Sequence, residues 1–180
     1  MPRVLVPLAQ GCEELEAVTI IDILRRAGIE VISAGLDAQP VRASRGTLLI
    51  PDTTLDDALS HSCDMVVLPG GQPGTRNLMA DARIIKLVKN MSRQEKYVAA
   101  ICAAPSVLAT AGILDGRHAT SFPGALDNFP QVKQQHAGVV EDGHIITSRG
   151  PGTAMDFALL LVEKLAGKGM RHEVEAGLQR

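Results

Sequence analysis

Short apolar runs alternate with longer amphipathic stretches along the first hundred residues of the chain. The apolar runs of strand length lie at residues 4–6, 30–34, 65–68 and 97–101. Between the first two, apolar residues recur every third position, which predicts a helix over residues 13–27 that ends at Gly28. The residues with this spacing are Leu15, Val18, Ile21 and Leu24. This strand–helix–strand opening predicts a βαβ unit with parallel strands and a right-handed crossover.

The rest of the chain continues this alternation with a few turn-centred segments. Helical patterns cover residues 82–91, 103–111 and 153–165, and one or two helical turns are expected over 54–59. Extended runs flank Ser44-Arg45-Gly46 within residues 41–51, which predicts a hairpin at the sheet's edge, and a second hairpin is predicted around Asp142-Gly143. Residues 119–121 predict a short strand. The order predicts an α/β doubly wound sandwich, a mostly parallel sheet with helices on both faces.

Composition narrows the class of protein further. A length of 180 residues suits a single domain over residues 1–180. Aromatic residues make up only 2% of the chain, so the core must be aliphatic and no base-stacking platform is expected. The net charge is -2 and the basic residues are scattered, so no dedicated nucleic-acid surface is expected.

The N-terminus has no secretory pattern, and no apolar run reaches the length of a membrane span. Cys12, Cys63 and Cys102 form neither a regular disulfide framework nor a metal-ligand cluster. We therefore expect reduced thiols in a cytoplasmic protein that needs no metal and no cofactor.

Cys102 stands where a strand gives way to a helix. It follows the apolar run that ends at Ile101, and Ala103-Ala104-Pro105 after it suits a sharp turn into a first helical turn. A cysteine at the positive end of a helix has a lowered thiol pKa, so a reactive thiolate is one interpretation. A buried structural cysteine fits the same spacing equally well.

Topology predicts which segments meet this cysteine. Ligands of open parallel sheets bind beyond the carboxyl ends of the strands, so residues 10–16 and the Gly70-Gly71 loop should converge on Cys102. Glu13 and Glu16 share a helix face, and one of them could face the thiol as a proton donor with a raised pKa. Carboxylates near a helix N-terminus are also common as plain complements of the helix dipole.

Backbone N–H groups of the glycine loop and of Ala103 could form an oxyanion hole, although Gly70-Gly71 also fits an ordinary turn. None of the five histidines neighbours Cys102 in sequence. His118 or His136 could approach it in space, but an exposed polar role is the more common one for each.

With these residues in place, the chain resembles the ThiJ/PfpI superfamily, and within it the branch of the bacterial YajL-type proteins and the human parkinsonism-associated deglycase. The resemblance spans nearly the whole chain, in family order. The matching stretches are Gly11-Cys12-Glu13-Glu14-Leu15-Glu16, Ser44-Arg45-Gly46, Val67-Leu68-Pro69-Gly70-Gly71, Ala100-Ile101-Cys102-Ala103-Ala104-Pro105 and Thr147-Ser148-Arg149-Gly150-Pro151-Gly152-Thr153.

The resemblance implies a flavodoxin-like sandwich that forms a homodimer. It implies that Cys102 is the reactive cysteine and Glu16 its carboxyl partner. It also implies oxyanion donors at Gly71 and Ala103, beside Gly70, and it places Arg45 near the dimer-side edge of the pocket.

Two departures from the family pattern bear on mechanism. Ala103 stands where the protease-like branch has a histidine, and Phe122 stands where human-type members carry one. A Cys–His dyad, and with it a protease, is therefore not favoured.

The resemblance implies a cysteine-dependent glyoxalase or deglycase in stress protection. Its substrates would be 2-oxoaldehydes such as methylglyoxal and glyoxal, or their early adducts on proteins and nucleotides. The alternative is an oxidative-stress sensor or redox-regulated chaperone that uses oxidation of Cys102. A hydrolase or hydratase with another small electrophile is a weaker third hypothesis.

Overall fold

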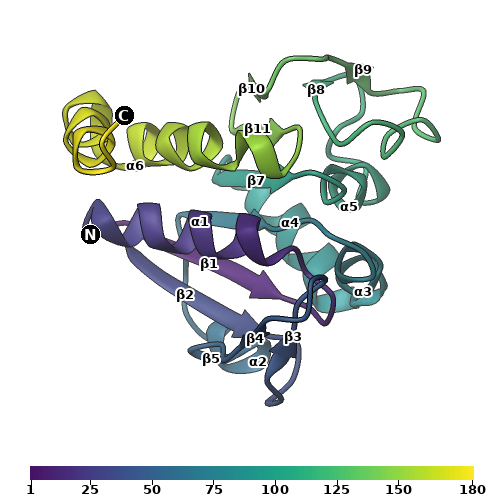
Figure 1. Cartoon of the computed structure of the whole chain (residues 1–180). Coiled ribbons are helices and arrows are strands. Elements are labelled where there is room, and N and C mark those ends of the chain that lie inside the picture. Colours follow the sequence, from purple (N-terminus) through teal and green to yellow (C-terminus); the bar gives the residue numbers. More distant parts are fainter.

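A computed structural model describes all 180 residues, Met1 to Arg180. Its centre is a seven-stranded sheet with the order β10-β11-β7-β6-β1-β2-β5 (Figure 1). Every neighbouring pair is parallel except β10 with β11. Apart from the β10–β11 hairpin at one edge, chain order runs outward from β1 in both directions, which makes the sheet doubly wound. The predicted α/β class with its mostly parallel sheet is confirmed.

The strands of this sheet and the two small sheets beside it are β1 (Arg3–Leu8), β2 (Glu30–Gly35), β3 (Val41–Arg42), β4 (Leu48–Leu49), β5 (Thr53–Thr54), β6 (Met65–Leu68), β7 (Tyr97–Ile101), β8 (His118–Ala119), β9 (Lys133–Gln134), β10 (Val139–Asp142) and β11 (Ile145–Ser148). The helices are α1 (Glu14–Arg26), α2 (Leu55–Ala58), α3 (Gly74–Ala80), α4 (Ala82–Arg93), α5 (Pro105–Thr110), η1 (Pro151–Thr153) and α6 (Ala154–Gly177).

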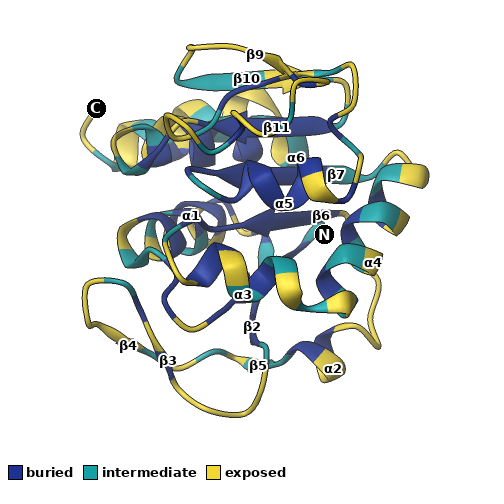
Figure 2. Cartoon of the chain, turned by 90° about the vertical axis from the view of Figure 1, so that its right-hand side faces the viewer, coloured by how far each residue is buried: buried dark blue, intermediate teal, exposed yellow.

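Two hydrophobic cores form because successive strand residues point to opposite faces of the sheet. In β1, Val4 and Val6 belong to the core under α1 and α6, whereas Leu5 belongs to the core under α2, α3, α4 and α5. Figure 1 shows α1 and α6 side by side on the first face, and Figure 2 shows the central strands buried and the outer loops exposed. Burial on both faces explains why the strands are continuous apolar runs rather than alternating ones.

The first predicted helix is confirmed as α1, but its core-facing stripe differs from the predicted spacing. The Glu13 side chain caps the helix by accepting a 2.7 Å hydrogen bond from the Glu16 N–H. Of the residues with the i, i+3 spacing, Leu24 is buried, whereas Leu15 and Val18 are 51% and 48% exposed. Three residues rotate the helix by about 300°, which is about 60° less than a full turn. Successive residues of the i, i+3 series therefore point in different directions, and the series passes from the solvent face to the core. The other residues that face the core are Ala17, Ile20 and Ile23.

Several predicted boundaries shift. The hairpin around Arg45 exists as antiparallel β3 and β4, but it forms a sheet of its own, and β5 is the edge strand of the main sheet. Helix α5 begins at Pro105 rather than at residue 103. Helix α6 continues well beyond residue 165, past a non-helical Gly167 with φ of 86°.

Three elements were not predicted. Helix α3 follows the glycine loop, β5 pairs in parallel with β2, and β9 pairs with β8 in a two-stranded parallel sheet. Strand β8 itself ends at Ala119, where the predicted strand over 119–121 begins. The hairpin of β10 and β11 is confirmed. No helix, α6 included, has both the length and the apolarity that crossing a bilayer requires.

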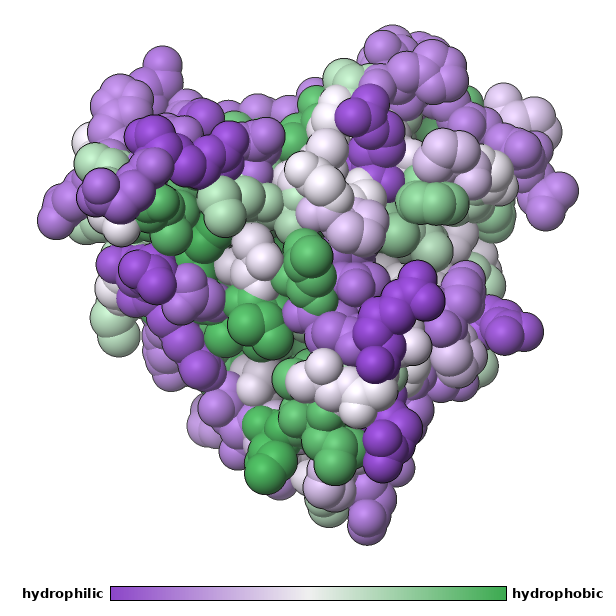
Figure 3. Space-filling model, in the orientation of Figure 1, coloured by the Kyte–Doolittle hydropathy of each residue, from purple (hydrophilic) through white to green (hydrophobic).

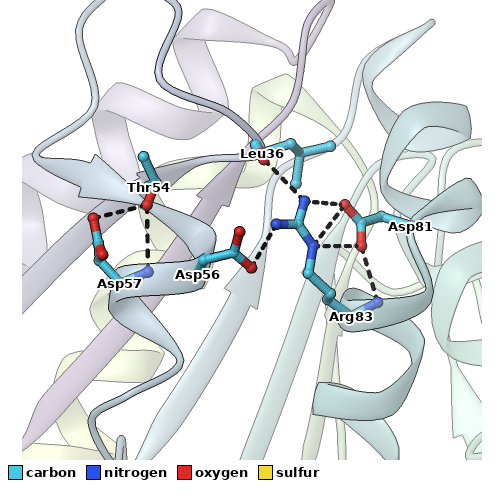
Figure 4. Close-up of polar contacts among 6 residues, drawn as sticks. All are labelled: Leu36, Thr54, Asp56, Asp57, Asp81 and Arg83. Carbon is cyan, nitrogen blue, oxygen red and sulfur yellow. Dashed lines mark hydrogen bonds and ion pairs between the residues drawn. The ribbon is translucent and has the colours of Figure 1, made fainter.

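An ion-pair network ties α2 and α4 to the end of β2 (Figure 4). The Arg83 guanidinium donates to Asp81 at 2.6 Å, to Asp56 at 2.8 Å and to the Leu36 carbonyl at 2.9 Å. Hydrogen bonds from Arg83 hold the pKa of Asp81 below its usual range. Beside it, the Thr54 hydroxyl caps α2 by accepting from the Asp57 N–H. Each charge of the network therefore has an opposite charge as its partner.

Candidate active site

Cys102 occupies a constrained turn between β7 and α5. Its φ is 64°, in the left-handed region that residues other than glycine rarely adopt. Its N–H donates to the Ser148 carbonyl at 2.9 Å, and its own carbonyl accepts from the Phe122 N–H at 2.8 Å. Neighbouring segments thus fix the backbone on both sides, which is how a strained residue persists in a folded protein.

Glu16, from the first turn of α1, is fully buried beside this turn, with an exposed fraction of 0%. Its Oε2 accepts a 2.8 Å hydrogen bond from the Gly70 N–H, whereas Oε1 is buried with no hydrogen-bond partner. A Cβ atom placed on Gly70 would lie 2.6 Å from Cys102 Cβ and 2.9 Å from Glu16 Oε2. Because Gly70 has no side chain, Cys102 and Glu16 can approach each other at this position.

The three segments converge as topology predicts, but Gly70 and Gly71 have different partners. The Gly70 N–H is used by Glu16, so this group does not face a ligand. The N–H groups of Gly71 and Ala103 instead donate toward the Cys102 sulfur, and neither has a backbone acceptor. These two donors stabilise negative charge on or beside that sulfur.

The predicted lowering of the Cys102 pKa is wrong. Burial, followed by the charge and the close approach of the Glu16 carboxyl, raises the pKa of Cys102 to about 12, against the opposing N–H groups of Gly71 and Ala103. Helix α5 has only six residues and begins three residues after the cysteine, so its dipole is weak at the sulfur. The thiol is therefore the resting form.

The pKa of Glu16 is raised in the same way as that of Cys102. Burial raises the pKa of Glu16 to about 7, although the Gly70 N–H and the Cys102 thiol oppose that rise. Two acids in contact cannot both ionise at neutral pH, so the pair keeps at least one proton. A carboxylate with a pKa near neutrality can take a proton from the adjacent thiol and return it.

A cavity of about 300 Å³ opens onto Cys102. Besides the cysteine and Gly71, its lining divides by chemistry into two sets, which we call the polar side and the apolar side. The polar side consists of Glu13, Ser44, Arg45 and Gln72, and the apolar side consists of Ala103, Phe122 and Pro151. The Arg45 side chain has no ion-pair partner, while its backbone N–H donates to Glu14 at 2.9 Å.

Several lining residues carried no signal in the sequence as part of a site. Gln72 follows a matched motif, Pro151 lies within one that was assigned no role at a site, and Phe122 was noted only as a departure from the family pattern. Phe122 reaches the cavity through its backbone hydrogen bond to a residue twenty positions earlier, which no local pattern reveals.

Other candidate groups stay away from the cavity. His118 and His136 are exposed and do not line it, so neither approaches Cys102 as a base. Cys12 and Cys63 are buried free thiols, and Cys63 contacts the Met91 sulfur. No group of three or more His, Cys, Asp or Glu side chains is placed to hold a metal ion.

Comparison with known proteins shows which family the chain belongs to. Residues 2–164 match the DJ-1/PfpI family model. The zebrafish (Danio rerio) Parkinson disease protein 7 homolog is 42% identical over 98% of this chain and 96% of its own length. The glutathione-independent glyoxalase DJR-1.2 of Caenorhabditis elegans is 36% identical over 88% of this chain and 85% of its own.

Among solved structures, oxidized DJ-1 of Toxoplasma gondii has a TM-score of 0.95 and 39% identity, covering 99% of this chain and 98% of that one. The family match and the near-complete coverage agree with the motifs that the sequence carries in family order. The chain therefore belongs to the DJ-1/PfpI family, also called the ThiJ/PfpI superfamily.

Proposed function

We propose that the protein is a cysteine-dependent glyoxalase or deglycase that acts on 2-oxoaldehydes such as methylglyoxal and glyoxal, or on their early adducts with proteins and nucleotides. The main supporting observation is a cavity-facing thiol at Cys102 beside a buried Glu16 whose pKa is raised to about 7. The glyoxalase named among the relatives supports the reaction class.

The first step is attack of the Cys102 sulfur on the aldehyde carbon. A C–S bond forms as the thiol proton passes to the Glu16 carboxylate, and the aldehyde oxygen takes the electron pair of its double bond. The N–H groups of Gly71 and Ala103 stabilise that oxyanion beside the sulfur. Proton return from Glu16 then gives a neutral hemithioacetal.

The second step moves hydrogen between the two carbons. Glu16 removes the proton from the former aldehyde carbon, and the released electron pair forms the C=C bond of an enediol-like species as the ketone oxygen takes the proton of the neighbouring hydroxyl. Glu16 then returns its proton to the adjacent carbon as the C=O bond of the thioester forms. This oxidises the aldehyde carbon to a thioester and reduces the ketone carbon to an alcohol. Water then cleaves the C–S bond, releases the 2-hydroxy acid and restores the thiol.

The direct test is turnover of methylglyoxal to lactate by the Cys102→Ser variant. A serine hydroxyl is far less acidic than a thiol, so kcat/KM should fall at least about 10³-fold. Cys63→Ala is the matched control, because Cys63 packs in the core away from the cavity and its removal should leave turnover per folded molecule unchanged. Full turnover by Cys102→Ser would refute the proposal.

A second candidate function is redox sensing or redox-regulated chaperone activity. It is favoured by the position of Cys102, whose sulfur faces a cavity with two N–H donors, and by the oxidized state named for the Toxoplasma relative. Two equivalents of peroxide would convert the thiol to a sulfinic acid and leave two waters. Mass spectrometry after mild peroxide should find oxygen on Cys102 before Cys12 and Cys63, and the opposite order would contradict it.

We also propose a homodimer in the cytoplasm. Leu15, Val18 and Met155 are exposed apolar side chains on α1 and at the start of α6, and hydrophobic side chains gather in this region in Figure 3. A second copy covering this face would remove them from water. Light scattering should report a dimer that the double substitution Leu15→Glu and Val18→Glu converts to a monomer.

The proposed cytoplasmic location is supported by the three free thiols, because a reducing compartment keeps cysteines in this form.

A further inference from the structure

The two sides of the cavity come from opposite sides of Cys102 in the sheet. Strand β7, which ends at the cysteine, lies between β11 and β6. Ala103 and Pro151, which follow β7 and β11, and Phe122, which follows β8, supply the apolar side. Segments that follow β1 and β6, together with the β3–β4 turn, supply the polar side. A ligand bound to the sulfur therefore meets different chemistry on its two flanks.

Phe122 is the largest group on the apolar side, and its backbone is tied to that of Cys102. Its N–H donates to the Cys102 carbonyl at 2.8 Å, so the Phe122 backbone is anchored to the proposed nucleophile's own backbone. Its Cδ2 lies 3.5 Å from where a Cβ on Gly150 would stand, an ordinary van der Waals distance, so the ring packs beside the Gly150 backbone.

The Phe122 ring also has apolar surface to offer. Phe157 is fully buried and Phe129 partly so, whereas Phe122 remains 50% exposed. A half-exposed aromatic ring beside Pro151 gains by covering its apolar surface.

We infer that Phe122, with Pro151, binds the substituent of the 2-oxoaldehyde and makes the enzyme selective for apolar substituents. This inference rests on the proposed function. A 2-oxoaldehyde has two carbonyl groups and one substituent. With the aldehyde carbon at Cys102 and its oxygen at the Gly71 and Ala103 N–H groups, the substituent lies against the apolar side. Phenyl should be favoured over methyl, and methyl over the hydrogen of glyoxal.

The test compares kcat/KM for glyoxal, methylglyoxal and phenylglyoxal in the wild type, Phe122→Leu and Phe122→Ala. The phenylglyoxal-to-glyoxal ratio should fall about tenfold in Phe122→Ala and less in Phe122→Leu, since leucine keeps part of the apolar surface. Gln72→Ala, on the polar side, should leave the ratio within about twofold of the wild type. An unchanged ratio in Phe122→Ala, with glyoxal turnover retained, would overturn the inference and leave the proposed function intact.

A binding measurement separates the two proposals when turnover is missing. Cys102→Ser, with and without Phe122→Ala, is titrated with 2-hydroxyacetophenone and hydroxyacetone, which share the carbonyl but differ in phenyl and methyl. Preference for the phenyl compound should fall about tenfold when Phe122 is removed. If the preference is lost on removal of Phe122 but the wild type does not turn over methylglyoxal, the glyoxalase proposal alone is refuted. If neither protein prefers the phenyl compound, the inference about Phe122 is overturned.

Discussion

The Arg83 network and the Cys102–Glu16 pair both hold carboxyl groups near the carboxyl ends of parallel strands, but they use them in opposite ways. Around Arg83, opposite charges meet, and the pKa of Asp81 is lowered by hydrogen bonds from the guanidinium. At Cys102, two acids meet, burial raises the pKa of both, and Glu16 Oε1 has no partner. The first arrangement stabilises the fold, whereas the second keeps a transferable proton at a cost in stability.

The largest expected effect is on catalysis, from Glu16→Gln. The amide can still accept from the Gly70 N–H but cannot take the thiol proton, so kcat/KM for methylglyoxal should fall about 10³-fold. Steady-state kinetics check this. Turnover within about threefold of the wild type would show that Glu16 acts only in packing.

The same substitution should remove a pH dependence of stability. The pKa of Glu16 is raised from 4.5 to about 7, so the folded state binds more protons than the unfolded state within this window. Wild-type stability should therefore fall, relative to Glu16→Gln, as pH rises from about 4.5 to 7, by at most roughly 3 kcal/mol. Urea unfolding of both proteins between these pH values measures it, and a pH-independent difference would contradict the shift.

Gly70→Ala tests how closely the pair is assembled. The added Cβ would stand 2.8 Å from the Ile101 carbonyl as well as close to Cys102 and Glu16, so backbone must move. We expect a loss of about 1–3 kcal/mol in the free energy of unfolding and about 10²-fold in turnover.

Gly152→Ala is the matched control for that change. Nothing lies within 4 Å of a Cβ at this position, so stability should change by less than about 0.5 kcal/mol. Equal losses in the two variants would mean that crowding at Gly70 is not the cause.

The smallest effect is expected at the Arg83 network. Arg83→Gln removes the charge that Asp81 and Asp56 share, and the partly exposed position should limit the loss to about 1–2 kcal/mol. Chemical denaturation should detect it, while turnover per folded molecule stays unchanged. Arg83→Lys should recover part of the loss, because a lysine keeps the charge without the planar fork. A fall in turnover per folded molecule would show that the Arg83 network also supports catalysis at Cys102.

Prediction from sequence succeeded wherever one local pattern decides the structure. The buried strands, the hairpin around Asp142-Gly143 and helix α1 follow from apolar runs, turn residues and caps. It failed for α3, which follows the glycine loop with no side-chain cap, and for the face of α1 that packs against α6. Which stripe of a helix is buried depends on its neighbour rather than on its own spacing.

For the candidate site, the same division holds at single residues. The convergence of Cys102, Glu16 and the glycine loop was predictable, because the carboxyl ends of parallel strands meet at one edge. The raised pKa values and the Phe122 side of the cavity were not, since both depend on burial and on hydrogen bonds between distant segments.

By itself, the sequence determined the succession of the buried central strands, helix α1, the aliphatic cores and the turn that carries Cys102, because these depend on periodicity, propensity and chain direction. Tertiary structure alone decided that this thiol is protonated at rest and that Glu16 can accept its proton near neutral pH. The physical reason is that desolvation and charge–charge interaction act between residues that only folding brings together, and their sign depends on what surrounds each group.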